Sequence, residues 1–133
     1  MRAQPLIAVQ DVEASSRWYQ RLLGAESGHG GPDYERLLVD GRLVLQLHHR
    51  EVEHDHGQIG DPTQVYGNGV LLWFETDAFD AAVARATELG AEVVRPVHRN
   101  PLDGDGGPNH REIWLRDPDG FVVVIVSPDG EAG

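Results

Sequence analysis

The chain has 133 residues, enough for one compact domain with a hydrophobic core. It carries 22 Asp and Glu residues against 11 Lys and Arg residues, and its formal net charge of −11 argues against binding to nucleic acid, whose phosphates it would repel. It contains no cysteine and no apolar run of membrane-spanning length, which excludes disulfides, thiolate metal sites and a membrane-spanning helix, and favours a cytoplasmic location.

The first half of the chain has the pattern of a strand, a helix and a hairpin. Asp11 is suited to cap the start of the helix and Gly24 to end it. Asp40-Gly41 is a strong signal for a tight turn between two strands. The predicted elements are a strand at 5–10, a helix between Asp11 and Gly24, strands at 34–40 and 42–49, and a long loop at 51–68.

The second half of the chain has the same pattern. A predicted helix carries apolar residues on one face and ends at Gly90. The turn Asp117-Pro118-Asp119-Gly120 predicts another hairpin. The predicted elements are a strand at 69–75, a helix at 77–89, a strand at 91–97, a loop at 100–109, and strands at 110–116 and 120–127.

The two halves form an internal repeat. Leu23-Gly24-Ala25-Glu26, at the end of the first helix, recurs as Leu89-Gly90-Ala91-Glu92 at the end of the second. Each half also closes with a hairpin. We therefore expect one domain over residues 1–133, built from two modules. Its expected parts are module one at about 4–50, a linker loop at 51–68, module two at about 69–127 and a tail at 128–133.

Two segments resemble a known family. The stretch from Val9 to Gly24, with Asp11 before the helix, is similar to the opening of the vicinal-oxygen-chelate superfamily of glyoxalases, bleomycin resistance proteins and dioxygenases. Ile113 to Phe121 resembles its closing hairpin, and the likeness extends over roughly residues 4–127. The resemblance implies an α+β fold, in which two βαβββ modules form a curved mixed sheet around a ligand cleft. It also implies a homodimer.

The positions that carry metal ligands in the metal-dependent relatives have changed here. By resemblance they fall on Gln4, Gln46, Leu71 (or Val70, in the other alignment) and Val124. Two are aliphatic and two are neutral amides, whereas a catalytic metal needs about three protein ligands. The glutamate that acts as ligand and base in the isomerases is also missing. We therefore expect no metal cofactor.

Strand alternation predicts which side chains line the cleft. Trp73 and Trp114 could sandwich a planar ligand and could also hold a cation. His110 and Glu112 share one strand face, and His98, which precedes the 100–109 loop, could approach them. The predicted ligand-binding residues are Gln4, Leu6, Gln46, His48, Leu71, Trp73, His110, Glu112, Trp114 and Val124.

Three functions are compatible with these residues. The preferred one is a metal-independent binding protein that sequesters an aromatic or cationic natural product, as the antibiotic-binding relatives do. The second is a lyase, isomerase or dioxygenase that uses Zn, Ni, Mn or Fe on relocated ligands. The third is a metal-free enzyme with His110 or Glu112 as acid–base. His54-Asp55-His56 is either a loop or lid, or a weak metal motif. The ligands of the second function would be Gln4, Gln46, His48, His110 and Glu112.

Overall fold

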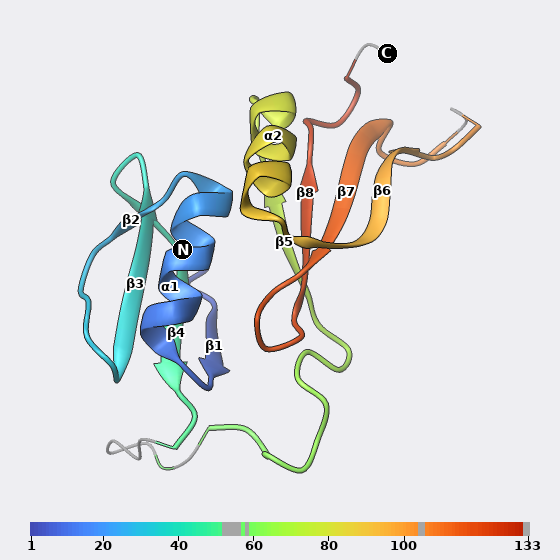
Figure 1. The fold of residues 1–133 in the computed structure, drawn as a ribbon. Coiled ribbons are helices and arrows are strands. Elements are labelled where there is room, and N and C mark those ends of the chain that lie inside the picture. Colours follow the sequence, from blue (N-terminus) through green and yellow to red (C-terminus); the bar gives the residue numbers. More distant parts are fainter. Residues whose placement is uncertain (52–56, 58, 104–105, 132–133) are drawn as a thin grey trace. The chain divides into compact units, whose positions relative to one another are not determined.

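The computed structural model describes residues 1–51, 57, 59–103 and 106–131. The chain folds as two compact units, residues 1–64 and 65–133, which we describe separately. Each unit has one four-stranded mixed sheet and one helix, in the order βαβββ (Figure 1). The predicted α+β fold of two βαβββ modules is therefore confirmed. Within the described part of the chain, neither helix has the length and apolar character needed to cross a membrane.

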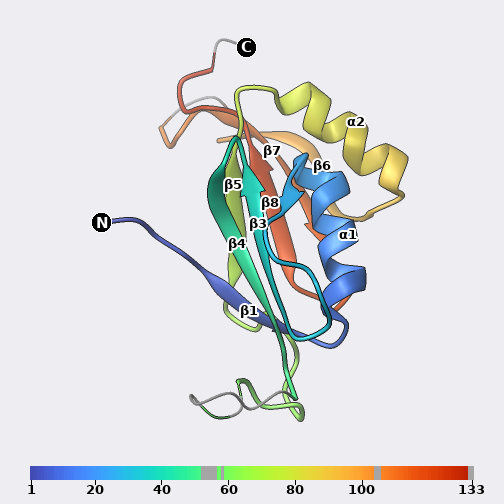
Figure 2. The ribbon, with the colours of Figure 1, turned by 90° about the vertical axis from the view of Figure 1, so that its left-hand side faces the viewer.

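The first unit places helix α1 against a mixed sheet with strand order β1-β4-β3-β2 (Figure 2). Strand β1 runs parallel to β4, and the other pairs are antiparallel. The elements are β1 (Leu6–Val9), α1 (Val12–Leu23), β2 (Glu26–Ser27), β3 (Tyr34–Val39) and β4 (Arg42–His49).

Local signals in the sequence fix the ends of α1. The Asp11 side chain accepts a hydrogen bond of 2.9 Å from the backbone N–H of Ala14, as an N-cap should. Gly24 ends the helix with a φ of 66°, a left-handed conformation that glycine adopts at little cost. The buried helix residues Tyr19 and Leu22 have no exposed surface. Their burial supplies the hydrophobic stabilisation that an isolated helix of this length would lack.

The second unit repeats the arrangement with strand order β5-β8-β7-β6. Strand β5 runs parallel to β8, and the remaining pairs are antiparallel. The elements are β5 (Leu71–Glu75), α2 (Phe79–Leu89), β6 (Glu92–Asn100), β7 (His110–Arg116) and β8 (Val122–Val126).

The strand register of the second unit determines which side chains share a face. Trp73 pairs with Val124, and Val124 pairs with Trp114, so these three form one cross-strand row. Arg111 reaches Asp80 on α2 at 2.8 Å, which puts the odd-numbered residues of β7 on the helix side. His110, Glu112 and Trp114 therefore lie on the face opposite α2, together with Trp73.

Three details differ from the sequence-based expectation. Strand β2 was not predicted between Gly24 and 34, because it has only two residues and lies in a polar, glycine-rich stretch. Strand β6 extends to Asn100, past the expected end at 97, with two register shifts that break its alternation. Helix α2 begins at Phe79, two residues after the expected start at 77, and its N-cap residue Ala78 has no side chain that could cap it.

A buried carboxylate holds the loop between β2 and β3 in the first unit. Glu35 is 3% exposed and its oxygens accept five hydrogen bonds. Burial alone would raise the pKa of Glu35, but these hydrogen bonds outweigh burial and lower it. The charge is therefore part of the native structure. The five donors are the hydroxyls of Ser16 and Ser27 and the backbone N–H groups of His29, Gly30 and Arg36.

We predict that Glu35→Gln lowers the free energy of unfolding by about 2 kcal/mol, because the amide removes the charge and leaves buried donors unsatisfied. Glu26→Gln, at an exposed site, is the control. The loss should be full at pH 7 and shrink as the pH falls below 4.5. A carboxyl whose pKa is lowered by folding stabilises the fold fully above its pKa in the unfolded chain, and this contribution is lost as the pH falls toward the folded pKa. Urea unfolding measures it, and equal stability of the two variants at pH 7 would contradict this role.

Candidate ligand-binding face

The centre of the candidate site in the second unit is the buried carboxylate of Glu112, which is 1% exposed. One oxygen accepts hydrogen bonds from Asn100 Nδ2 at 2.8 Å and His110 Nε2 at 2.7 Å. The other accepts from Trp114 Nε1 at 2.8 Å. The expected approach of His98 is confirmed, with its Nε2 atom 3.2 Å from the second oxygen. Both carboxylate oxygens are thus engaged inside the protein.

His110 links this carboxylate to the segment that follows β8. Its Nδ1 atom lies 2.9 Å from Asp129 Oδ1, while its Nε2 atom faces Glu112. A carboxylate at each ring nitrogen favours the protonated imidazole, in which both nitrogens donate. The ring is 2% exposed and has no nitrogen left for another partner.

The charges of this network hold one another in place. Burial would raise the pKa of Glu112, but the hydrogen bonds from Asn100, Trp114 and His110 outweigh burial and hold it at about 2. Burial would lower the pKa of His110, but its bonds to Glu112 and Asp129 outweigh burial and raise it. A carboxyl with so low a pKa is a weak general base near neutral pH.

Accessible side chains lie on the same face. Trp73 is 47% exposed and Leu71 is 44% exposed, although both are large and apolar. The Trp73 ring lies 6.0 Å from the His110 ring, at an interplanar angle of 50°. Glu75 follows two residues along β5 and is also exposed. Trp114 is half-buried under the guanidinium of Arg95, which lies 5.1 Å from its ring centroid.

The predicted residues of the first unit form a second, separate group. Leu6 and Arg36 both pair with Gln46, so these three side chains share a row. The Gln46 amide donates to the Gln4 carbonyl at 2.9 Å and accepts from the Tyr34 hydroxyl. His48 lies on the same face, is 2% exposed, and its Nδ1 atom is 2.8 Å from the His49 carbonyl.

The predicted site residues come from both units. Gln4, Leu6, Gln46 and His48 belong to the first unit. The second unit places its six predicted residues on one face of its sheet, although Val124 has no exposed surface. These six are Leu71, Trp73, His110, Glu112, Trp114 and Val124.

Four residues of this site were missed from the sequence, and one of them is Arg95, whose place over Trp114 depends on the irregular register of β6. Glu75 could have been found, since it continues the alternation of Leu71 and Trp73 along one strand. Asn100 was assigned to a loop, and its place opposite His110 depends on the irregular register of β6. Asp129 belongs to the segment after β8, where no periodic pattern exists. Its contact with His110 depends on how that segment folds back.

The residues of the alternative metal set come from both units: Gln4, Gln46 and His48 lie in the first, and His110 and Glu112 lie in the second. The described part of the chain contains no group of three or more His, Asp or Glu side chains able to hold a metal ion. His54-Asp55-His56 lies outside the described residues. Both nitrogens of His110 and both oxygens of Glu112 have protein partners, so a metal ion at this pair would have to displace them.

The network predicts a pH window for stability. The raised pKa of His110 stabilises the fold below 6.5, and this stabilisation is lost as the pH rises through the raised value. The lowered pKa of Glu112 stabilises the fold above 4.5, and this contribution is lost as the pH falls toward about 2. The two contributions therefore coincide between pH 4.5 and 6.5.

An NMR titration of the His110 ring tests this arrangement. The midpoint should lie above 6.5 in the wild type and fall in Asp129→Asn, because that variant removes a carboxylate partner. Asp77→Asn makes the same charge change at an exposed site in the same unit and should leave the midpoint unchanged. A midpoint that does not respond to Asp129→Asn would show that the two side chains are not coupled.

Comparison with known proteins places the chain in a family. The family model described as Glyoxalase/Bleomycin resistance protein/Dioxygenase superfamily matches residues 3–125. A search of curated proteins found no match.

Similar solved structures include a virulence protein from Salmonella typhimurium, with 24% identity, coverage of 96% of this chain and 97% of that chain, and a TM-score of 0.69. A lactoylglutathione lyase from Agrobacterium tumefaciens has 17% identity, coverage of 95% and 92%, and a TM-score of 0.68. A glyoxalase-related enzyme from Fulvimarina pelagi has 17% identity, coverage of 96% and 88%, and a TM-score of 0.71. These structural likenesses show the fold alone. The match of the family model shows that the chain belongs to the glyoxalase/bleomycin resistance protein/dioxygenase superfamily.

Proposed function

We propose that this protein binds a flat aromatic, cationic small molecule on the Trp73 face of the second unit, and does so without a metal. The observation that carries the proposal is the difference in exposure between Trp73 and the buried residues next to it. The indole is 47% exposed, whereas the hydrogen-bonding atoms of Glu112 and His110 beside it are occupied. This face therefore offers apolar contact, and its buried polar groups have little capacity left for chemistry.

The aromatic preference follows from the exposed side chains. Trp73 and Leu71 provide an apolar surface on which a planar ring can stack, and Trp73 has only two side-chain torsions to immobilise. Small-molecule sites are commonly made of such apolar side chains with few polar groups. The buried hydrogen-bond network of Glu112 and His110 supports this role, because it holds the side chains next to Trp73 in place before a ligand binds.

The cationic preference rests on the Glu75 carboxylate, because the positive groups of this face already have partners: His110 contacts Glu112 and Asp129, and Arg95 lies over Trp114. Glu75 is exposed on the strand that carries Trp73, and it takes part in none of the ion pairs found among the described residues. A cation over the indole would gain about 0.5–2 kcal/mol from the ring, and the nearby carboxylate would add to this attraction. The net charge of −11 favours the approach of a cation to the protein as a whole.

The biological role that we propose is sequestration of a toxic natural product by a cytoplasmic homodimer. The support for sequestration is the family, whose description includes bleomycin resistance proteins. It is joined by the aliphatic residues Leu71 (or Val70, in the other alignment) and Val124, which by resemblance stand where metal-dependent relatives carry ligands. Dimerisation is proposed because closed symmetric dimers are the commonest state of soluble oligomers.

Calorimetry with 9-aminoacridine, a flat cation, and acridine, its neutral counterpart at pH 7.5, tests this function. Trp73→Ala should weaken the binding of both compounds about tenfold, because a stacking contact worth about 1.4 kcal/mol is lost. Glu75→Gln should weaken only the binding of 9-aminoacridine. The matched controls are Trp18→Phe on α1 and Glu88→Gln on α2, which should bind like the wild type.

Two results would contradict the proposal. One is the absence of binding by either compound and by a wider panel of aromatic cations. The other is binding that Trp73→Ala leaves unchanged.

Elemental analysis of untagged protein tests whether binding is metal-independent. The protein should bind 9-aminoacridine equally well before and after treatment with a chelator. Stoichiometric Zn, Ni, Mn or Fe that disappears in His48→Ala or Glu112→Ala would instead support the enzyme hypothesis. A conservative Glu112→Gln variant, whose fold is checked by circular dichroism, separates the loss of a ligand from the loss of the structure.

A further inference from the structure

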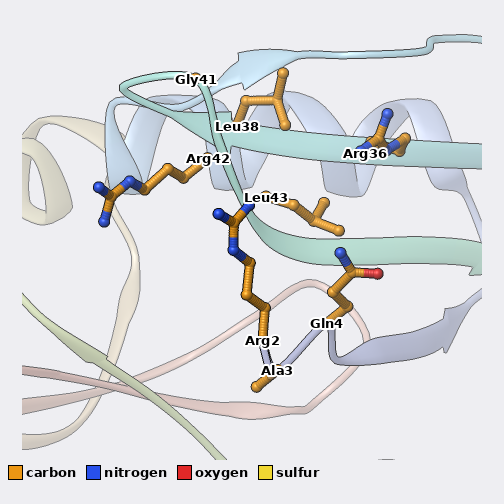
Figure 3. A pocket seen from close by; sticks show the side chains of 8 residues that line it. All are labelled: Arg2, Ala3, Gln4, Arg36, Leu38, Gly41, Arg42 and Leu43. Carbon is orange, nitrogen blue, oxygen red and sulfur yellow. The ribbon is translucent and has the colours of Figure 1, made fainter.

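The first unit contains an open hollow of about 610 Å³ beside the β3–β4 hairpin. Three of the side chains that line it are arginines, from three different segments: Arg2 from the N-terminal segment, Arg36 from β3 and Arg42 from β4. In Figure 3, Arg2 and Gln4 extend from the N-terminal segment toward the hairpin. No residue that lines the hollow is acidic. The hollow is therefore a site of concentrated positive charge.

This concentration is unusual for the chain as a whole, which has twice as many acidic as basic residues. Four arginines elsewhere in the described residues form ion pairs with carboxylates, among them Arg111 with Glu131 at 2.7 Å and Arg116 with Glu92 at 3.5 Å. None of the ion pairs found there includes Arg2, Arg36 or Arg42. Their planar guanidinium groups are thus available to an oxyanion, which they can bind through paired hydrogen bonds.

Local structure holds these segments together. The backbone N–H of Gln46 donates to the Pro5 carbonyl at 2.9 Å, and its side-chain amide donates to the Gln4 carbonyl at 2.9 Å. These bonds fix the N-terminal segment beside β4. The tight turn at Asp40 and Gly41, with φ values of 50° and 75°, brings Arg42 back beside β3. The wall between the arginines is apolar, since Leu38 and Leu43 are both half-buried there.

We infer that this hollow binds a small organic anion. Its phosphate or carboxylate group would lie against the guanidinium groups, and its apolar part would lie on Leu38 and Leu43. The site belongs to the first unit and does not depend on the binding proposed at Trp73 in the second. Its test uses anionic probes and first-unit variants, so failure of one proposal leaves the other standing.

NMR titration of the ¹⁵N-labelled protein with phenyl phosphate and with inorganic phosphate, at constant ionic strength, tests the inference. Both probes should give saturable shifts at the backbone N–H groups of Leu38, Gly41 and Leu43. Phenyl phosphate should bind more tightly. The double variant Arg36→Gln/Arg42→Gln should weaken both probes at least about tenfold, the usual effect of losing a hydrogen bond between charged groups. Leu43→Ser should weaken phenyl phosphate alone.

Arg17→Gln is the control for overall charge, because it removes one positive charge at an exposed position on α1, outside the hollow. It should bind both probes like the wild type. Shifts that do not saturate, or that persist unchanged in the double variant, would overturn the site. Equal weakening by Arg17→Gln would show general charge screening and would also overturn it. Equal affinity for the two probes would overturn the assignment of an organic anion.

Discussion

The buried carboxylate of Glu112 is the constraint on which the second unit depends. Taking a charge out of water is costly unless hydrogen bonds and an opposite charge compensate it. Here Asn100, Trp114 and His110 supply those partners at 2.7–2.8 Å, and Asp129 holds His110 from the other side. The requirement to satisfy one charge thereby links β6, β7 and the segment after β8. Trp73 lies beside this network and remains accessible to solvent.

Each module has a buried glutamate on its third strand, but the two glutamates have different roles. Glu35 lies on β3 and Glu112 on β7, each the third strand of its module. Glu35 turns toward the helix side, where Ser16 of α1 donates to it, and it holds a loop. Glu112 lies on the face opposite α2. This difference fits an internal repeat whose copies keep one fold and have diverged in the residues that the fold carries.

Much of the fold could be predicted from local signals, and much of the site could not. Asp11, Gly24 and the Asp40-Gly41 turn act within a few residues, so their effects can be read directly from the sequence. Alternation along β5, β7 and β8 predicted that Trp73, Val124 and Trp114 line the same cleft, and the structure places the three in one cross-strand row. The contacts of Asn100 and Asp129 join segments separated by bulges and turns. No periodic pattern records such contacts, because they depend on how complete strands come together.

We propose that His110 and Glu112 form a fixed structural network and do not ligate a metal. A high-resolution crystal structure of the protein grown with excess Zn²⁺ or Mn²⁺, with anomalous scattering recorded at the metal edge, tests this claim most directly. Both Glu112 oxygens should keep their bonds to His110, Trp114 and Asn100, with no anomalous peak within coordination distance of either residue. A metal ion bound to His110 or Glu112, with those hydrogen bonds broken, would contradict it.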